Sequence, residues 1–212
     1  MTRLQPLPQR RDVPEIAVLC SGHGTNLQAI IQAVRSGTLR VRIAVVVSDR
    51  ADAYALRRAQ RAGVASTHLD PNSYPTRRAF DRALATLLQA RQVDLVCLAG
   101  FMRVLSPAFV RQFPQRILNI HPALLPAFPG AHTIRDALAW GVKVTGVTVH
   151  LVDDQVDHGP IVLQEALAIR PHETQASLLA RVHRIEHRLY PEAIRLLLAK
   201  RLQVRGRVVQ IK

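Results

Sequence analysis

Short apolar runs and amphipathic stretches alternate along the first half of the chain. Apolar runs typical of buried strands lie at residues 16–20, 41–47, 65–69 and 95–99. Apolar side chains recur at helical spacing at residues 26–34, 54–62 and 75–92, with Pro75 expected to open the last helix. This alternation of strand and helix predicts an α/β protein whose sheet is parallel in its first half.

The second half of the chain contains one more strand of the same kind and then a different pattern. Residues 117–121 form an apolar run that Pro122 ends, because proline cannot donate to a strand ladder. Ser106 and Pro107 open a short helix before this strand, and a proline-rich loop after it leads to a helix near residues 133–140. The remaining elements are expected to be strands at 144–152 and 161–169, a long helix at 174–201 and a strand-like segment at 204–211.

These patterns predict one folded domain with an extension at each end. Residues 1–14 are polar, basic and proline-rich, and we expect a flexible basic extension there rather than a signal peptide. Residues 15–203 form the predicted domain, and residues 204–212 form a basic C-terminal tail. No apolar run reaches the length of a membrane span, so no membrane association is expected.

Composition and charge narrow the class of protein further. The chain has 212 residues and a formal net charge of +14, which is compatible with nucleic-acid binding. However, the basic residues are scattered and no aromatic-rich platform accompanies them, so nucleic acid is not expected as a partner. Cys20 and Cys97 both lie in apolar runs, and two buried thiols indicate a reducing cytoplasmic location rather than a disulfide.

Two polar residues interrupt the strand at residues 117–121. Asn119 and His121 are two positions apart and therefore face the same side of the strand, while Leu118 and Ile120 face the core. A lone buried histidine is usually a hydrogen-bonded core residue. A carboxamide beside an imidazole, however, can bind a carbonyl oxygen and move a proton, which makes this pair the first candidate catalytic group.

A glycine-containing loop, SGHGTNL at residues 21–27, joins the first strand to the first helix. Small residues before a helix N-terminus allow backbone N–H groups to approach an anion, which predicts a phosphate site. A dinucleotide site is a weaker alternative, with Asp49 as the ribose-binding acid, because Leu27 occupies the third glycine position. A tight turn without a ligand is a third alternative.

Two further motifs carry ionisable groups. The acidic turn at residues 153–160 contains Asp157, one of several acids that could pair with His121 and stabilise its cation. His183, Glu186 and His187 match the zinc pattern H-x-x-E-H, but few residues remain downstream for a third ligand. We therefore expect no metal and regard the histidine pair as part of an amphipathic helix.

Four segments in order carry a resemblance to a known family. They are SGHGTNLQA at residues 21–29, LAGFMRVLSP at 98–107, NIHP at 119–122 and VDHGP at 156–160. Together they resemble the phosphoribosylglycinamide formyltransferases of purine synthesis over residues 15–202. The resemblance implies a Rossmann-like, three-layer α/β formyltransferase fold with a mostly parallel central sheet and helices on both faces. It also implies formyl transfer from 10-formyltetrahydrofolate, a co-substrate, to the amine of glycinamide ribonucleotide.

The resemblance also implies roles for individual residues. Asn119 and His121 match the catalytic pair, and Asp157 matches the carboxylate that keeps the histidine charged. The matching ribonucleotide contacts are Gly24, Thr25, Asn26 and Glu186, and the matching folate contacts are Arg77, Met102, Arg103, Val104, Leu105 and Asn119. Two departures are Ala123, where serine is common, and the segment at residues 145–148, which leaves Thr145 without an assigned role.

Related activities and a different class of protein were weighed as alternatives. A methionyl-tRNA formyltransferase would explain the basic charge but carries a further C-terminal domain, for which the residues after the long helix are too few. A formyltetrahydrofolate hydrolase has a regulatory domain that residues 1–14 are too short to provide. A non-catalytic nucleotide- or RNA-binding module would explain the loop and the charge but not Asn119, His121 and Asp157. A monomer or a homodimer is expected.

Overall fold

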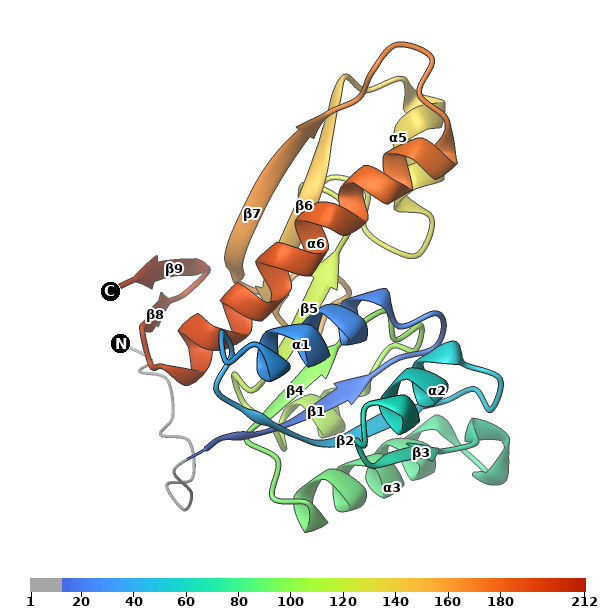
Figure 1. Ribbon diagram of the computed structural model, residues 1–212, viewed down its shortest axis with the longest axis vertical. Helices are drawn as coiled ribbons and strands as arrows, with labels where there is room; N and C mark the ends of the chain where they lie inside the picture. The colour runs from blue at the N-terminus through green and yellow to red at the C-terminus, as the bar shows by residue number, and fades with distance from the viewer. Residues whose placement is uncertain (1–12) are drawn as a thin grey trace.

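A seven-stranded sheet forms the centre of the molecule, which a computed structural model describes over residues 13–212 (Figure 1). In spatial order its strands are β3 (Ser66–His68), β2 (Arg42–Ser48), β1 (Glu15–Leu19), β4 (Leu95–Leu98), β5 (Ile117–His121), β6 (Val144–Leu151) and β7 (Ile161–Ala168). The first five of these strands run parallel, β6 pairs antiparallel with β5, and β7 pairs antiparallel with β6. The mostly parallel sheet predicted from the sequence is therefore confirmed. Residues 1–12, most of the expected N-terminal extension, lie outside the described residues.

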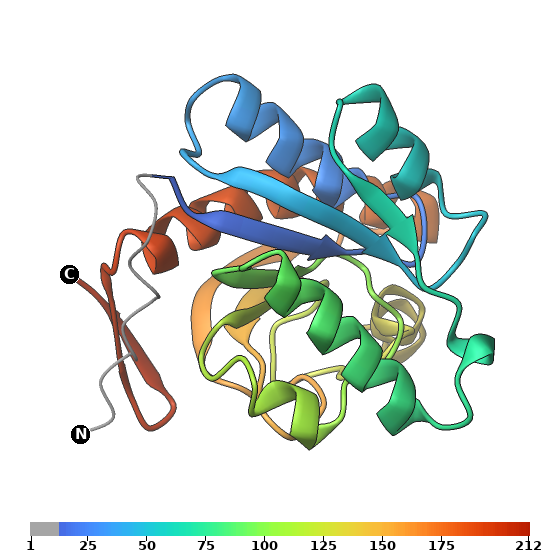
Figure 2. The ribbon, with the colours of Figure 1, turned by 90° about the horizontal axis from the view of Figure 1, so that it is seen from below.

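Helices cover both faces of the sheet and make the fold three-layered (Figure 2). On one face lie α1 (Thr25–Arg35), α2 (Tyr54–Arg61), α5 (Thr133–Trp140) and α6 (Gln175–Leu198). On the other face lie α3 (Arg77–Ala90) and the short α4 (Pro107–Val110). Each face buries its own cluster of apolar side chains, as expected for an α/β sheet with two covered sides.

Side-chain caps set the start of several helices and explain where the expected boundaries were wrong. The hydroxyl of Thr76 accepts a hydrogen bond from Ala79 N–H at 3.1 Å, so α3 begins at Arg77 and not at Pro75. A 3₁₀ turn, Pro71–Ser73, precedes it. Thr174 caps α6 in the same way through Ser177 N–H at 3.2 Å, and α6 ends at Leu198 rather than at residue 201.

The C-terminal segment is a hairpin and not the single strand expected over residues 204–211. Its strands β8 (Leu202–Arg205) and β9 (Val208–Ile211) pair antiparallel across a two-residue turn. The turn contains Gly206 at φ 57°, a left-handed conformation that glycine adopts without strain. Leu202 and Val204 of β8 are buried in the larger core cluster, so the hairpin packs on the domain rather than trailing from it.

Loop residues contact one sheet face where β5 and β6 lie. The core cluster under α3 and α4 includes Ile117 at the start of β5 but no residue of β6. Beyond Ile117 the same face of β5 carries Asn119 and His121, and no helix of the described chain adds apolar side chains there. The sheet thus presents a polar strip at this point, and the candidate site is built on that strip.

Candidate active site

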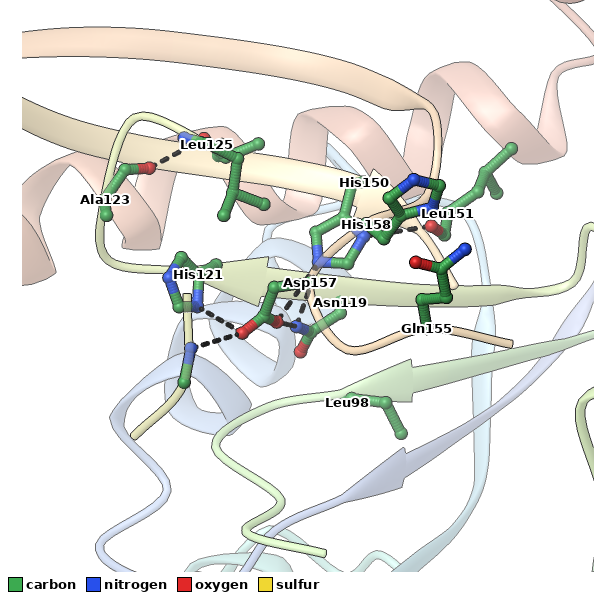
Figure 3. A network of polar contacts seen from close by, with 12 residues as sticks. Leu98, Asn119, His121, Ala123, Leu125, His150, Leu151, Gln155, Asp157 and His158 are labelled. Carbon is green, nitrogen blue, oxygen red and sulfur yellow. Dashed lines mark hydrogen bonds and ion pairs between the residues drawn. The ribbon is translucent and has the colours of Figure 1, made fainter. Parts of the chain in front are cut away.

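Four polar side chains meet on this polar strip and form one hydrogen-bonded cluster (Figure 3). Asn119 and His121 come from β5, His150 comes from β6, and Asp157 comes from the loop between β6 and β7. Leu118 and Ile120, by contrast, lie in the core on the opposite face, as strand alternation predicted. The pairing of Asn119, His121 and Asp157 expected from the sequence is therefore present in the geometry.

Asn119 is held by two partners through the same nitrogen. Its Nδ2 lies 3.1 Å from Nε2 of His150 and 3.3 Å from Oδ1 of Asp157. His150 Nδ1 lies 2.9 Å from the carbonyl oxygen of Leu151, which can only accept, so Nδ1 carries the proton and Nε2 accepts from Asn119. The carboxamide orientation is therefore fixed, with its nitrogen toward the imidazole and the carboxylate.

The ring of His121 is almost completely enclosed, with acceptors beside both nitrogens. Nε2 lies 2.8 Å from the carbonyl oxygen of Phe128, and Nδ1 lies 3.4 Å from Oδ2 of Asp157. Burial lowers the pKa of His121 below its ordinary value and outweighs the opposing effects of Asp157 and the Phe128 carbonyl. The expectation that Asp157 keeps His121 charged is thus wrong in its net direction, because desolvation is the larger contribution.

Asp157 is the hub of the cluster and adopts an uncommon backbone conformation. Its φ is 50°, and its Oδ2 accepts a hydrogen bond from Gly130 N–H at 2.8 Å. Burial raises the pKa of Asp157, but the neighbouring His150 imidazole and Gly130 N–H, together with His121, lower it by more, so the net pKa is below its ordinary value. The carboxylate is consequently charged before any substrate arrives.

His150 is a site residue that the sequence reasoning missed. It is 1% exposed and lies directly opposite Asn119 in the antiparallel register of β5 and β6, while Thr148 lies opposite His121. The available signal was the alternation of Thr148 and His150 within an apolar strand, which puts both on the face opposite the apolar core. Which residue each would face depended on the register, which the sequence does not reveal.

A cavity of about 230 Å³ opens beside the cluster. Its lining includes four expected folate contacts, Met102, Arg103, Val104 and Leu105, together with Asn119, His121 and Asp157. Met102 and Val104 are largely exposed, which leaves apolar surface available to a ligand. The guanidinium of Arg103 lies 4.9 Å from the ring centre of Phe80, so this arginine is packed in place. Arg77, the remaining expected folate contact, is exposed at the start of α3 and is not among the cavity residues.

The predicted phosphate loop precedes an open helix N-terminus. Gly24 is the N-cap of α1, and no side chain caps this helix, so its first N–H groups are oriented toward the loop. Gly24 also has a structural requirement: its φ is 68°, and a Cβ there would lie 2.7 Å from Cβ of Ala55. Thr25 and Asn26 form the first turn, and Asn26 Nδ2 donates to Oε2 of Glu186 at 3.1 Å.

Glu186 therefore joins the expected ribonucleotide contacts from a helix 160 positions away in sequence. It is 4% exposed, and burial raises its pKa to about 7 although the Asn26 hydrogen bond opposes the shift. The two histidines of the H-x-x-E-H pattern stack on each other, with ring centres 5.8 Å apart. Within residues 13–212, no group of three or more metal-ligating side chains is placed to hold an ion.

The fold and this site are typical of one protein family, and comparison with known proteins identifies that family. Residues 14–194 match the formyl transferase family, and the chain belongs to it. The phosphoribosylglycinamide formyltransferase of Escherichia coli (strain K12) is 44% identical over 179 residues, which are 84% of this chain and 84% of that protein. The enzyme of that name from Bacillus subtilis (strain 168) is 38% identical and is covered to 94% of its length.

A solved structure and a longer relative complete the comparison. Glycinamide ribonucleotide transformylase 1 from Symbiobacterium toebii is 55% identical, with a TM-score of 0.93 and 98% of each chain covered. The trifunctional purine biosynthetic protein adenosine-3 of Gallus gallus is 44% identical over 190 residues, but this chain spans only 19% of its length. The family resemblance inferred from the four sequence segments is confirmed.

Proposed function

We propose that this protein transfers a formyl group from 10-formyltetrahydrofolate to the amine of N1-(5-phospho-D-ribosyl)glycinamide. The products would be the N2-formyl ribonucleotide and tetrahydrofolate, in de novo purine (IMP) biosynthesis. The observation that carries this proposal is the meeting of Asn119, His121 and Asp157 in the lining of a cavity that residues 102–105 also line. The names of the relatives support the choice of substrate.

The chemistry assigned to the cluster is stabilisation of a developing oxyanion and movement of a proton. When the amine attacks the formyl carbon, negative charge grows on the formyl oxygen, and a fixed N–H donor stabilises it. Asn119 can supply this donor if the longer of its two contacts, the 3.3 Å one to Asp157, gives way to the formyl oxygen. The contact with His150 then keeps the carboxamide oriented.

His121 and Asp157 are assigned to proton transfer. The lowered pKa of His121 makes the imidazole neutral at the start of the reaction and able to accept a proton. A proton on Nδ1 faces Asp157 at 3.4 Å while Nε2–H donates to Phe128, so the charged ring is stabilised on both sides. The charged histidine can then support the oxyanion, and the proton can continue toward the folate nitrogen.

The two substrates are assigned to two different groups of residues. We assign the phosphate and ribose to Gly24, Thr25, Asn26 and Glu186, where helix N–H groups and a buried carboxyl lie together. We assign the folate ring to the cavity beside residues 102–105, whose apolar surface suits a flat heterocycle. Arg77 stays in the proposal as an exposed contact for the distal part of the folate.

The proposal includes small-molecule partners, a cytoplasmic location and a monomer or homodimer. In residues 13–212, no helix is both long and apolar enough to cross a membrane. The buried, unbridged thiols of Cys20 and Cys97 fit a reducing compartment. The chemistry assigned to the cluster uses protein side chains and requires no metal.

An assay with 10-formyltetrahydrofolate and two acceptors tests the proposed function. We expect rapid formyl transfer to glycinamide ribonucleotide and none to initiator methionyl-tRNA. Preference for the tRNA would contradict the proposal, and so would release of formate at the same rate with and without an acceptor. A salt titration of RNA binding provides the control for the basic charge, because counterion release makes such binding steeply salt-dependent.

A further inference from the structure

The loop that carries Asp157 is not fixed by strand pairing. Asn119, His121 and His150 lie in β5 and β6, whereas Asp157 lies between the end of β6 and the start of β7. Its positive φ of 50° is held by contacts outside the sheet ladder. The position of the proposed catalytic carboxylate therefore depends on the contacts that the loop at residues 153–160 makes.

Part of this support lies within the loop itself. Oδ1 of Asp153 accepts from Gln155 N–H at 3.0 Å, and its Oδ2 lies 2.7 Å from Nδ1 of His158. Gly159 packs so closely that a Cβ there would lie 1.8 Å from the carbonyl oxygen of Leu151. The Asp153 contacts lie within the loop, and the Gly159 contact joins the end of the loop to β6, but none of them fixes the ring of His158 to another element.

The attachment comes from Arg207 in the turn of the C-terminal hairpin. Its Nη2 donates to the carbonyl oxygen of His158 at 2.6 Å, and its Nη1 lies 2.9 Å from Nε2 of the same residue. Nη1 also lies 3.2 Å from Nδ1 of His158, so it contacts both ring nitrogens, while Nδ1 lies 2.7 Å from Oδ2 of Asp153. The guanidinium thus holds both the backbone and the ring of the residue that directly follows Asp157.

The hairpin is itself anchored and can act as a rigid support. Leu202 and Val204 of β8 are 3% and 4% exposed and belong to the larger core cluster. β9 packs against β7, beside which the hairpin lies in Figure 1. Backbone N–H of Lys212 also donates to the carbonyl oxygen of Arg201 at 2.7 Å, which closes the hairpin at its open end.

We propose that Arg207 is a positioning residue, which holds His158 so that Asp157 stays against His121 and Gly130. This inference rests on the proposed role of Asp157 in formyl transfer. It gives a function to one arginine of the basic C-terminal segment. Arg207 touches no reacting atom, and its effect is transmitted through the loop.

The test is a double-mutant cycle between Arg207→Ala and Asp157→Asn, measured as kcat for formyl transfer to glycinamide ribonucleotide. Arg207→Ala alone should lower kcat about tenfold, because small displacements of a catalytic group are costly, with an unchanged KM for the ribonucleotide. In the Asp157→Asn background the same change should have almost no further effect. A role confined to general stability would instead lower both backgrounds by the same factor, and that result would overturn the inference.

Three controls separate the possible failures. Arg205→Ala removes the same charge from the same hairpin without touching His158, and it should leave kcat and KM as in the wild type. Arg207→Lys keeps the charge but not the two-pronged donor, so full activity in this folded variant would contradict the geometry. If Asp157→Asn retains normal kcat, the proposed catalytic role of the cluster is contradicted. If Asp157→Asn lowers kcat but Arg207→Ala does not, only the positioning role of Arg207 is contradicted.

Discussion

Two carboxylates, the half-buried Asp157 and the buried Glu186, have opposite electrostatic environments. Asp157 accepts a hydrogen bond from Gly130 and lies beside the rings of His121 and His150, and its pKa is lowered. Glu186 is buried with the Asn26 amide as its hydrogen-bond donor, and its pKa is raised to about 7. Burial opposes the charge of both, so the difference is made by the number of donors that the fold supplies.

This difference indicates that the two carboxylates are not equally supplied with hydrogen-bond partners before substrate binds. The hydrogen-bond partners of Asp157 are in place: its carboxylate is charged and its neighbours are already oriented. Glu186 has too few hydrogen-bond donors, because one amide only partly compensates the burial of its carboxyl group. A ribose hydroxyl would supply the missing donor, so we expect changes at Asp157 to affect the chemical step and changes at Glu186 to affect binding and stability.

The largest effect is expected from removing the β5 pair next to Asp157. Asn119→Ala and His121→Ala should each lower kcat by about a hundredfold or more, because each removes a fixed group that faces the developing charge. Steady-state kinetics together with circular dichroism would measure activity and confirm folding. Near-normal turnover in either folded variant would remove that residue from the catalytic assignment.

Asp157→Asn should have the next largest effect, because it keeps the shape of the side chain and removes the charge. The Asp157 charge raises the pKa of His121 against the larger effect of burial, so its loss should lower that pKa further. Activity near neutral pH should fall at least about tenfold as the charged imidazole becomes harder to form. NMR titration of His121 and the pH dependence of kcat provide the measurements.

Asp154→Asn is the matched control for the histidine titration, because Asp154 is an exposed acid of the same loop. It should change the pKa of His121 much less than Asp157→Asn does. If Asp154→Asn has the larger effect on that pKa, the wrong carboxylate has been assigned to the cluster.

Glu186→Gln should separate binding from stability. The folded-state pKa of Glu186 lies above the unfolded value, so the stability linked to its proton is present at low pH and is lost as pH rises toward 7. Between about pH 5 and about pH 8, the variant should gain a few kcal/mol of unfolding free energy relative to the wild type. Urea denaturation at the two pH values measures this gain, and a constant difference between them would contradict the raised pKa.

The same variant should bind the ribonucleotide more weakly while leaving the chemical step largely intact. A glutamine keeps one acceptor oxygen but cannot become charged when a ribose hydroxyl donates to it. We expect the KM for glycinamide ribonucleotide to rise about tenfold with little change in kcat. A rise in the KM for the folate instead would place Glu186 outside the ribonucleotide site.

The smallest effect is expected from metal removal, which should change neither the chemical step at Asp157 nor binding at Glu186. Dialysis against a strong chelator should leave kcat unchanged, because the proposed chemistry uses Asn119, His121 and Asp157 without a Lewis acid. Loss of activity that zinc restores would contradict this expectation and would favour a metal role for His183 and His187.

The sequence predicted the elements well and the site in part, for identifiable physical reasons. Hydrophobic periodicity located the strands of the sheet, and strand alternation placed Asn119 and His121 on one face. His150 was missed because its position opposite Asn119 follows from the register of β5 and β6. The C-terminal hairpin was missed because Gly206 was not recognised as the turn residue that divides the expected strand.

The sequence by itself determined the local patterns, the order of the four motifs and the residue types available for chemistry. Tertiary structure decided which of several loop acids reaches His121, that Glu186 meets Asn26, and that Arg207 contacts His158. It also decided the direction of the His121 pKa shift, because desolvation depends on how many atoms surround the ring. Periodicity is a property of neighbouring residues, whereas burial and long-range contacts exist only once distant segments have packed together.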